Sequence, residues 1–151
     1  MGSKYPEKEL EFFNRGISGN RVIELYGRIY EDMIALKPDV VSILVGVNDG
    51  PQAEHGRHAT GATYGAIYRM MLKELKEACP DVKLVVMEPF IGKEGPVYDD
   101  DYELWAECIG AYQQEARKIA EEFDAVFVPL QEMFDRACEK RETHYWIWDG
   151  I

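Results

Sequence analysis

The feature that most constrains the fold is a near-continuous apolar run, rich in β-branched side chains, over residues Val40–Gly46. A strand that is apolar on both sides is typical of a parallel sheet whose two faces are covered by helices. Similar runs recur at Val82–Met87 and Ala125–Val128, with helix-like spacing of apolar residues between them. This alternation predicts an α/β fold with an open parallel sheet.

The remaining elements follow from apolar spacing and from the prolines that end helices. No repeat, low-complexity tract or linker interrupts the chain, which predicts a single domain over residues 4–151, with residues 1–3 taken as an added start. The pattern predicts a short strand at Leu10–Asn14, a loop at residues 88–101 that forms a lid or wall, and helices at residues 20–36, 62–78, 102–123 and 131–140.

Composition excludes several classes of function. The 151 residues carry 17 Lys and Arg against 28 Asp and Glu, a net charge of −11, which disfavours nucleic-acid and anionic membrane partners. No apolar run in the sequence reaches the roughly 18 residues that span a bilayer. Three cysteines, an odd number without a C-x-x-C pair, indicate reduced thiols and a cytoplasmic protein.

Ligands bind in such sheets at loops just beyond the carboxyl ends of strands. The first such loop, residues 16–20, has glycines that expose backbone N–H groups before a helix, a natural seat for an oxygen with negative charge. A plain turn with Asn20 or Ser18 as a helix cap explains the same residues. Ser18 lacks the glycine two places later that the G-x-S-x-G nucleophile elbow needs, so we interpret it as structural.

Two later segments offer polar groups of other kinds. In Gly46–Gly50, Asn48 can give a side-chain amide N–H to a developing oxyanion, and Asp49 can accept hydrogen bonds from loop backbone. In Trp146–Ile151, Asp149 can orient a histidine. Taken alone, the Asn-Asp-Gly of the first segment is better explained as an ordinary turn, and the Asp-Gly of the second has the same alternative explanation.

Taken together, the segments Gly-x-Ser-Gly-Asn, Gly-Val-Asn-Asp and Trp-Asp-Gly-Ile resemble, in order and strand context, those of the SGNH hydrolases, the GDSL lipase/esterase superfamily. The resemblance implies a flavodoxin-like three-layer α/β/α fold. It also implies hydrolysis of small acyl esters through a serine acyl-enzyme, without a cofactor. It assigns Gly19 and Asn48 to the oxyanion hole and Asp149 to the catalytic triad, with Asp49 and Gly46 supporting the loops.

The sequence departs from the family pattern at both ends. It contains no Gly-Asp-Ser motif, and a histidine three residues after Asp149 would be residue 152, so the nucleophilic serine and the catalytic histidine are not in the chain. His55, His58 and His144 match no family position, and we interpret them as surface or structural residues rather than metal ligands. We therefore expect a truncated hydrolase domain that is inactive alone, or active only when the missing segments complement it.

In the family's sheet the first strand, which this chain lacks, lies between the second and third, so Leu10–Asn14 and Val40–Val45 would face a gap. Unpaired strand edges invite pairing with another chain. We expect a homo-oligomer in which a strand of another copy fills the gap, or a sheet that pairs differently.

Two other functions are alternatives to the esterase. One is a non-catalytic α/β fragment or engineered scaffold that works through self-association. The other is a flavin-binding domain, which has less support because the loop after the first strand lacks the phosphate-cradling Ser/Thr residues it would need.

Overall fold

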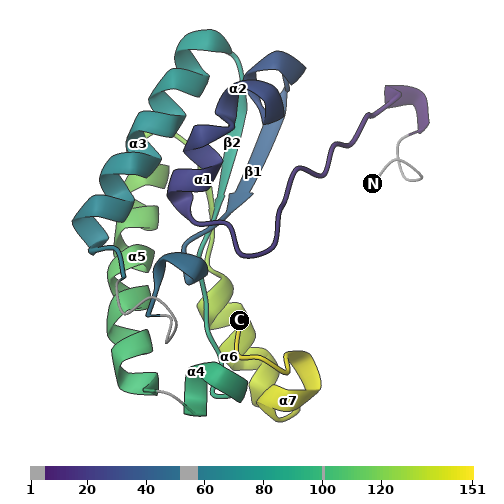
Figure 1. Ribbon diagram of the computed structural model, residues 1–151. Coiled ribbons are helices and arrows are strands. Elements are labelled where there is room, and N and C mark those ends of the chain that lie inside the picture. Colours follow the sequence, from purple (N-terminus) through teal and green to yellow (C-terminus); the bar gives the residue numbers. More distant parts are fainter. Residues whose placement is uncertain (1–5, 52–57, 100) are drawn as a thin grey trace.

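The computed structural model describes residues 6–51, 58–99 and 101–151. Its sheet has parallel strands in the order β1-β2-β3, which are β1 (Val40–Leu44), β2 (Lys83–Met87) and β3 (Val126–Val128) (Figure 1). Val41 of β1 lies opposite Leu84 of β2 in the register of the sheet. The predicted α/β class, a parallel sheet with helices beside it, is confirmed.

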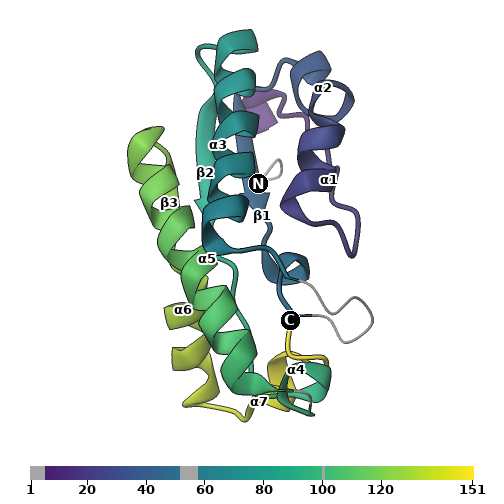
Figure 2. The same ribbon diagram turned by 60° about the vertical axis from the view of Figure 1, so that its left-hand side comes forward.

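Two long helices cover one face of this sheet, α3 (Gly61–Ala78) and α5 (Tyr102–Glu122) (Figure 2). Each begins at a side-chain cap, because the Thr60 and Asp101 side chains accept backbone N–H groups of the first turns. The core between helices and sheet includes Tyr64, Tyr68, Leu72, Leu84, Val86, Ile109 and Tyr112. Both helices match their predicted ranges to within one residue, since each has a long apolar face.

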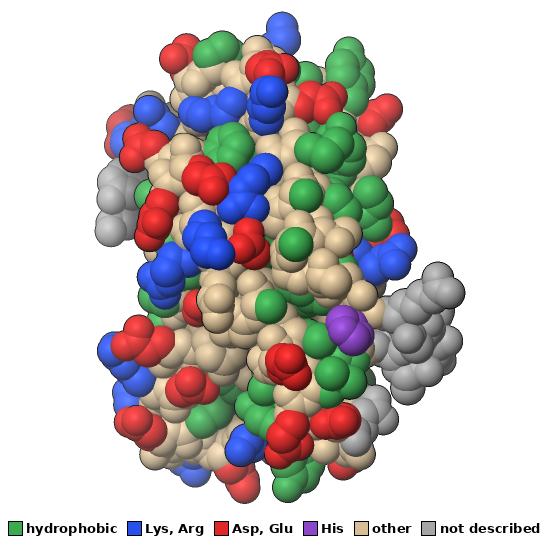
Figure 3. Space-filling view, turned by 90° about the vertical axis from the view of Figure 1, so that its left-hand side faces the viewer, with side chains coloured by type: hydrophobic (Ala, Val, Ile, Leu, Met, Phe, Trp, Pro, Cys, Tyr) green, Lys and Arg blue, Asp and Glu red, His purple; other side chains and the backbone are tan. Residues whose placement is uncertain are grey.

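The outer surface of the α3–α5 layer is polar. Arg69 of α3 binds two acids of α5: its Nη1 lies 2.7 Å from Glu115 Oε2, and its Nε lies 2.6 Å from Glu122 Oε2. Figure 3 shows basic and acidic side chains interspersed over this face of the molecule. The charged outer surface and the apolar inner surface account for the spacing of apolar residues in both helices.

The segment predicted as one helix over residues 20–36 is broken instead. It forms α1 (Val22–Gly27), α2 (Ile29–Asp32) and a 3₁₀ turn, η3 (Ile34–Leu36). The backbone leaves the helical region at Arg28 (φ −122°, ψ 18°) and at Met33 (φ −128°). Each short helix buries a single residue, Val22 or Ile29. Helices gain most of their stability from packing, and two buried residues are too few to stabilise one continuous helix over this segment.

Beside the long helices, the chain contains short helices and turns that the sequence did not predict. Helix α6 (Leu130–Cys138) matches the prediction within two residues. Helix α4 (Gly95–Asp99) lies inside the predicted loop, and α7 (Thr143–Trp146) follows α6, while a 3₁₀ turn, η2 (Pro6–Lys8), lies near the N-terminus. Elements of three to five residues are too short for a hydrophobic period to be visible.

One face of β1 is open, contrary to the prediction from its apolar sequence. Val40, Ser42 and Leu44 are exposed, whereas Ile43, which points to the opposite face, is buried. Val126 of β3, on the same side as Ser42, is also exposed. In the described residues α3 and α5 lie against a single face of the sheet, so the expectation that this strand is buried on both faces is wrong.

Residues 10–14 do not form the predicted strand. They run as an exposed segment without regular structure that leads away from the sheet (Figure 1). A strand exists through its hydrogen bonds to a neighbour, and the outer edge of β1 has no strand beside it in the part of the chain that the structure describes. Among the described residues, therefore, no segment of the same chain pairs with the outer edge of β1. Strand exchange between copies stays a prediction.

Two further expectations concern membranes and thiols. Within the described ranges, no helix combines the length and apolar character needed to cross a bilayer. Cys79, Cys108 and Cys138 are free thiols, as their odd number and separation predict.

Candidate active site

The turn after β1 begins at a backbone position that only glycine tolerates without strain. Gly46 has a φ of 132°, and a Cβ on it would lie 3.2 Å from side-chain atoms of Pro89 and Tyr64. The Tyr64 hydroxyl, from α3, donates to the Val45 carbonyl oxygen at 3.1 Å. The following 3₁₀ turn, η4 (Val47–Asp49), is thus fixed from the core side of the sheet.

A buried carboxylate joins this turn to α1. Asp49 Oδ2 accepts the N–H of Val22, the first residue of α1, at 3.0 Å. The carbonyl oxygen of Asp49 accepts the Tyr112 hydroxyl at 2.8 Å and the Ala59 N–H at 3.0 Å. Burial raises the pKa of Asp49 to about 6, although the hydrogen bond from Val22 and the charge of Arg21 act in the opposite direction. These contacts are of the kind that the predicted supporting role requires.

The contact of Asp49 with Val22 also corrects one alternative for residues 16–20. The N-cap of α1 is Arg21, and the first N–H of the helix is satisfied by Asp49 of another turn. Neither Ser18 nor Asn20 makes a side-chain cap there. Ser18 lies exposed in the preceding turn. The glycines of this loop are therefore not explained by a helix cap on α1.

The two turns with the predicted oxyanion donors lie against each other. Asn48 Nδ2 donates to the carbonyl oxygen of Asn20 at 3.3 Å, and Asn20 directly follows Gly19. Gly19 has a φ of 82°, in the left-handed region that favours glycine. Figures 1 and 2 both show the start of α1 beside η4, at the carboxyl end of β1. The structure thus brings the loop of Gly19 and the turn of Asn48 to one place.

Asp149 lies in the C-terminal segment, which packs against the loop after β2. The Gly92 N–H donates to the Gly150 carbonyl oxygen at 2.9 Å, and Asp149 Oδ1 accepts the Ile151 N–H at 3.3 Å. Both ribbon views place the C-terminus beside η4 (Figures 1 and 2). The segment of Asp149 therefore reaches the same end of the sheet as Asn48, and its role in a triad stays a prediction.

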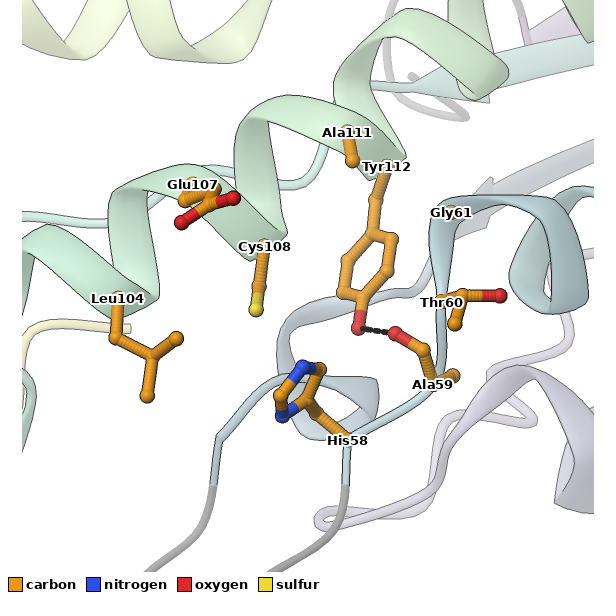
Figure 4. A pocket seen from close by; sticks show the side chains of 9 residues that line it. All are labelled: His58, Ala59, Thr60, Gly61, Leu104, Glu107, Cys108, Ala111 and Tyr112. Carbon is orange, nitrogen blue, oxygen red and sulfur yellow. Dashed lines mark hydrogen bonds between the residues drawn. The ribbon is translucent and has the colours of Figure 1, made fainter.

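A small pocket of about 190 Å³ lies between the starts of α3 and α5. His58 and Cys108 face this hollow, and the Tyr112 hydroxyl contacts the Ala59 carbonyl oxygen at its floor (Figure 4). Burial, and next the charge of Glu107, raise the pKa of the Cys108 thiol, which keeps it in the unreactive protonated form. The pocket holds no residue predicted for catalysis.

The histidines and possible metal ligands can be placed only in part. His144 Nδ1 lies 3.2 Å from Glu94 Oε1 at the surface, and His55 lies outside the described residues. Among the described residues, no group of three His, Cys, Asp or Glu side chains could hold a metal ion. The expectation that the histidines are surface or structural residues stays a prediction.

Sequence reasoning missed three residues that hold these turns. Apolar spacing correctly places Tyr64 and Tyr112 on inward helix faces, yet it does not show that their hydroxyls bind turn backbone. A buried tyrosine hydroxyl usually finds a partner, which is a usable signal. Arg28, which binds the loop of residues 15–20, has no comparable signal in the sequence.

Comparison with known proteins identifies the family. A model described as the GDSL-like Lipase/Acylhydrolase family matches residues 2–150. The chain belongs to the GDSL-like lipase/acylhydrolase family. The resemblance to SGNH hydrolases that the motifs indicate is therefore confirmed, and ester hydrolysis is the reaction class of the family.

Three similar proteins illustrate the match. An acetylxylan esterase from Geobacillus stearothermophilus is 32% identical over 154 residues, which cover 97% of this chain and 66% of that protein. Its crystal structure has a TM-score of 0.81. A protein from Parabacteroides merdae, described as a GDSL-like lipase, has a TM-score of 0.92 at 37% identity. The match covers 99% of this chain and 68% of that protein. LAE5, an alpha/beta hydrolase from the metagenome of Lake Arreo in Spain, has a TM-score of 0.83 at 26% identity, with the same coverage. The chain thus spans about two thirds of the length of these relatives.

Proposed function

We propose that this chain provides the oxyanion hole and the triad acid of an SGNH-type ester hydrolase. Gly19, through its backbone N–H, and Asn48, through its side-chain amide, stabilise the oxyanion of a tetrahedral intermediate. Gly46 and Asp49 hold the turn of Asn48. The observation that supports this most is the hydrogen bond from Asn48 to Asn20, which joins the turns of both donors.

Variants of the Geobacillus esterase support the assignment of Asp149. Those described as catalytic mutants replace a serine, an aspartate or a histidine with alanine. In that protein the aspartate lies three residues before the histidine, and a tryptophan that was also mutated directly precedes the aspartate. This chain has the same tryptophan–aspartate order in Trp148-Asp149. We therefore assign Asp149 to orient the imidazole that activates the serine.

The reaction assigned to the complete site is a two-step acyl transfer. The serine oxygen attacks the acyl carbonyl carbon while the histidine takes its proton, and the negative charge develops on the carbonyl oxygen between Gly19 and Asn48. The alcohol leaves with that proton, and water then releases the acid from the acyl-enzyme. The 151 residues contain neither the family's serine motif nor a histidine after Asp149, so we propose that this polypeptide alone does not turn over.

The substrate proposed is a small acyl ester, with acetyl groups on a carbohydrate as the class that the acetylxylan esterase suggests. Aromatic side chains near Asp149 are exposed, with Trp148 at 73% and Tyr145 at 64%. The sequence alone favours packing as their role over stacking on a sugar, but such exposure leaves their rings accessible to a sugar face.

The test places residues 4–151 between the flanking segments of the Geobacillus esterase that carry its catalytic serine and histidine. We expect this chimaera to hydrolyse p-nitrophenyl acetate and to react with a fluorophosphonate probe. Asn48→Ala should lower its kcat by about 10²–10³-fold, and Asp149→Asn by about 10⁴-fold. Gln114→Ala, which removes an exposed amide on α5, is the matched control and should leave kcat unchanged. An active chimaera that tolerates Asn48→Ala contradicts the proposed oxyanion hole, and serine labelling of the 151-residue chain contradicts its inactivity.

The second function, self-association of a non-catalytic domain, is favoured by one observation. Leu10, Phe12 and Phe13 are 42%, 65% and 57% exposed, and the outer edge of β1 lacks a neighbouring strand in the described residues. We propose that residues 10–14 of one copy pair with this edge in another copy. Light scattering should then show a dimer that Phe12→Asp dissociates, and a monomer at all concentrations rules out this pairing.

A further inference from the structure

Arg28 stands at the break between α1 and α2, with its side chain 21% exposed. Its guanidinium group makes three contacts with polar groups. The Nε donates to Asn20 Oδ1 at 3.0 Å, and Nη1 donates to the Arg15 carbonyl oxygen at 2.8 Å. The same Nη1 binds the carboxylate of Asp32, one turn along. One side chain thus contacts both ends of the loop that contains Gly19.

Asn20 connects this contact to the other turn of the candidate site. Its side-chain oxygen accepts from Arg28, and its carbonyl oxygen accepts from Asn48 Nδ2. The hydrogen bonds therefore run in sequence from Asp32 to Arg28, to Asn20 and to Asn48. A change at Arg28 is therefore expected to move the group that binds the Asn48 amide.

Among the described residues, the loop has few other contacts that hold it. Residues 15–19 are all exposed, so burial of apolar groups contributes little to their position. Its local hydrogen bonds run from Gly16 N–H to Asn14 Oδ1 and from Asn20 N–H to the Ile17 carbonyl oxygen. Both join residues two or three apart and shape the loop without attaching it to the body of the protein.

We propose that Arg28, held by Asp32, is a positioning residue for the oxyanion hole. This inference rests on the proposed function of Gly19 and Asn48. The guanidinium suits the task because its donors are fixed in one plane and can satisfy several acceptors at once. A lysine ammonium keeps the charge but cannot reproduce this arrangement, so Arg28→Lys should restore the loop only in part.

The experiment uses the ¹⁵N-labelled 151-residue chain in three variants, Arg28→Met, Arg28→Lys and Asp32→Asn. NMR follows the Gly19 backbone amide and the Asn48 side-chain amide, and the heteronuclear NOE at Gly19 reports the order of the loop. Arg28→Met should shift both amides and lower the NOE, with smaller changes in the other two variants. Arg136→Met is the matched control, because Arg136 forms an exposed i,i+4 ion pair with Glu132 on α6 and should leave both amides unchanged.

Acetate, the product of the proposed reaction, separates this inference from the function on which it rests. In the unaltered chain it should shift the Gly19 and Asn48 amides, and Arg28→Met should weaken its binding by at least about threefold. Unchanged amides in all three variants overturn the role of Arg28. Should Arg28→Met unfold the chain, Arg28→Lys and Asp32→Asn decide by the same readouts. If acetate shifts neither amide although the variants do, the oxyanion hole fails and the positioning contact stands.

Discussion

The two turns of the candidate site differ in how they are held. The turn of residues 46–50 is mostly buried. The Tyr112 hydroxyl binds the carbonyl oxygen of Asp49 within it, and the Tyr64 hydroxyl binds that of Val45 directly before it. The loop of residues 16–20 is mostly exposed and is attached by polar contacts to Arg28 and Asn48. Asn48 is therefore placed by the rigid part of the fold, whereas Gly19 is placed by a few surface hydrogen bonds. Regions with little burial open at low free-energy cost, so we expect the oxyanion hole to be stiff on one side and adjustable on the other.

The largest effect should come from a methyl group on the buried side. Gly46→Ala places a Cβ 3.2 Å from Pro89 and Tyr64 at a φ of 132°. Backbone strain and overpacking each cost about 1–3 kcal/mol, so we expect the free energy of unfolding to fall by about 4 kcal/mol in urea denaturation.

Gly110→Ala is the control for this substitution. Gly110 lies within α5, where an added Cβ meets no described atom within 4 Å. Because alanine is the better helix former, this variant should be more stable than the unaltered chain by about 0.5–1 kcal/mol. If Gly46→Ala lowers the free energy of unfolding by no more than about 1 kcal/mol, the tight packing of this turn is contradicted.

A second effect on the buried side depends on pH. The pKa of Asp49 is about 6 in the folded protein against 3.8 for the free group, so the folded state favours the protonated carboxyl. The stability that this proton gives is fully present below pH 3.8 and is lost as the pH rises through 6. About two pKa units correspond to about 3 kcal/mol.

Asp49→Asn removes the titrating group while its side-chain oxygen can still accept the Val22 N–H. The free energy of unfolding of the variant, minus that of the unaltered chain, should therefore increase by about 3 kcal/mol between pH 3.5 and 7.5. Urea denaturation at several pH values measures this difference. Asp39→Asn, at an exposed aspartate, should show no comparable trend. A flat difference for Asp49→Asn shows that its carboxylate is adequately solvated in the fold.

The same contrast explains how much of the fold the sequence could predict. β1, β2, β3, α3 and α5 each carry a continuous apolar signal, and their ranges agree with the structure to within two residues. Residues 10–14 and 20–36 contain apolar residues too, but the secondary structure of these two segments depends on which other parts of the protein pack against them. The predicted strand does not form because it has no neighbouring strand among the described residues, and the long helix breaks because it buries little.

The candidate site was predictable to the same extent. Asn48 was singled out because it lies in the loop after a buried strand, where ligands bind in parallel sheets. Gly19 was assigned through the resemblance to the SGNH hydrolases, since the strand expected before its loop does not form. Arg28 and Tyr112 could not be found in this way, because their contacts join segments that become neighbours only after folding.

The smallest effect should come from the exposed side and completes the comparison. Gly19→Ala also places a Cβ on a residue with positive φ, 82°, but this Cβ meets no described atom within 4 Å. The free energy of unfolding should therefore fall only by the cost of holding an alanine in a left-handed backbone conformation, about 1 kcal/mol, measured in the same urea experiment as for Gly46→Ala. Because the loop can instead relax to a negative φ, the Asn20 carbonyl oxygen should move and the Asn48 side-chain amide resonance should shift with it. Equal losses at Gly19 and Gly46 would show that the two turns are held alike. A small loss with an unshifted Asn48 amide would show that this amide keeps its position without the loop.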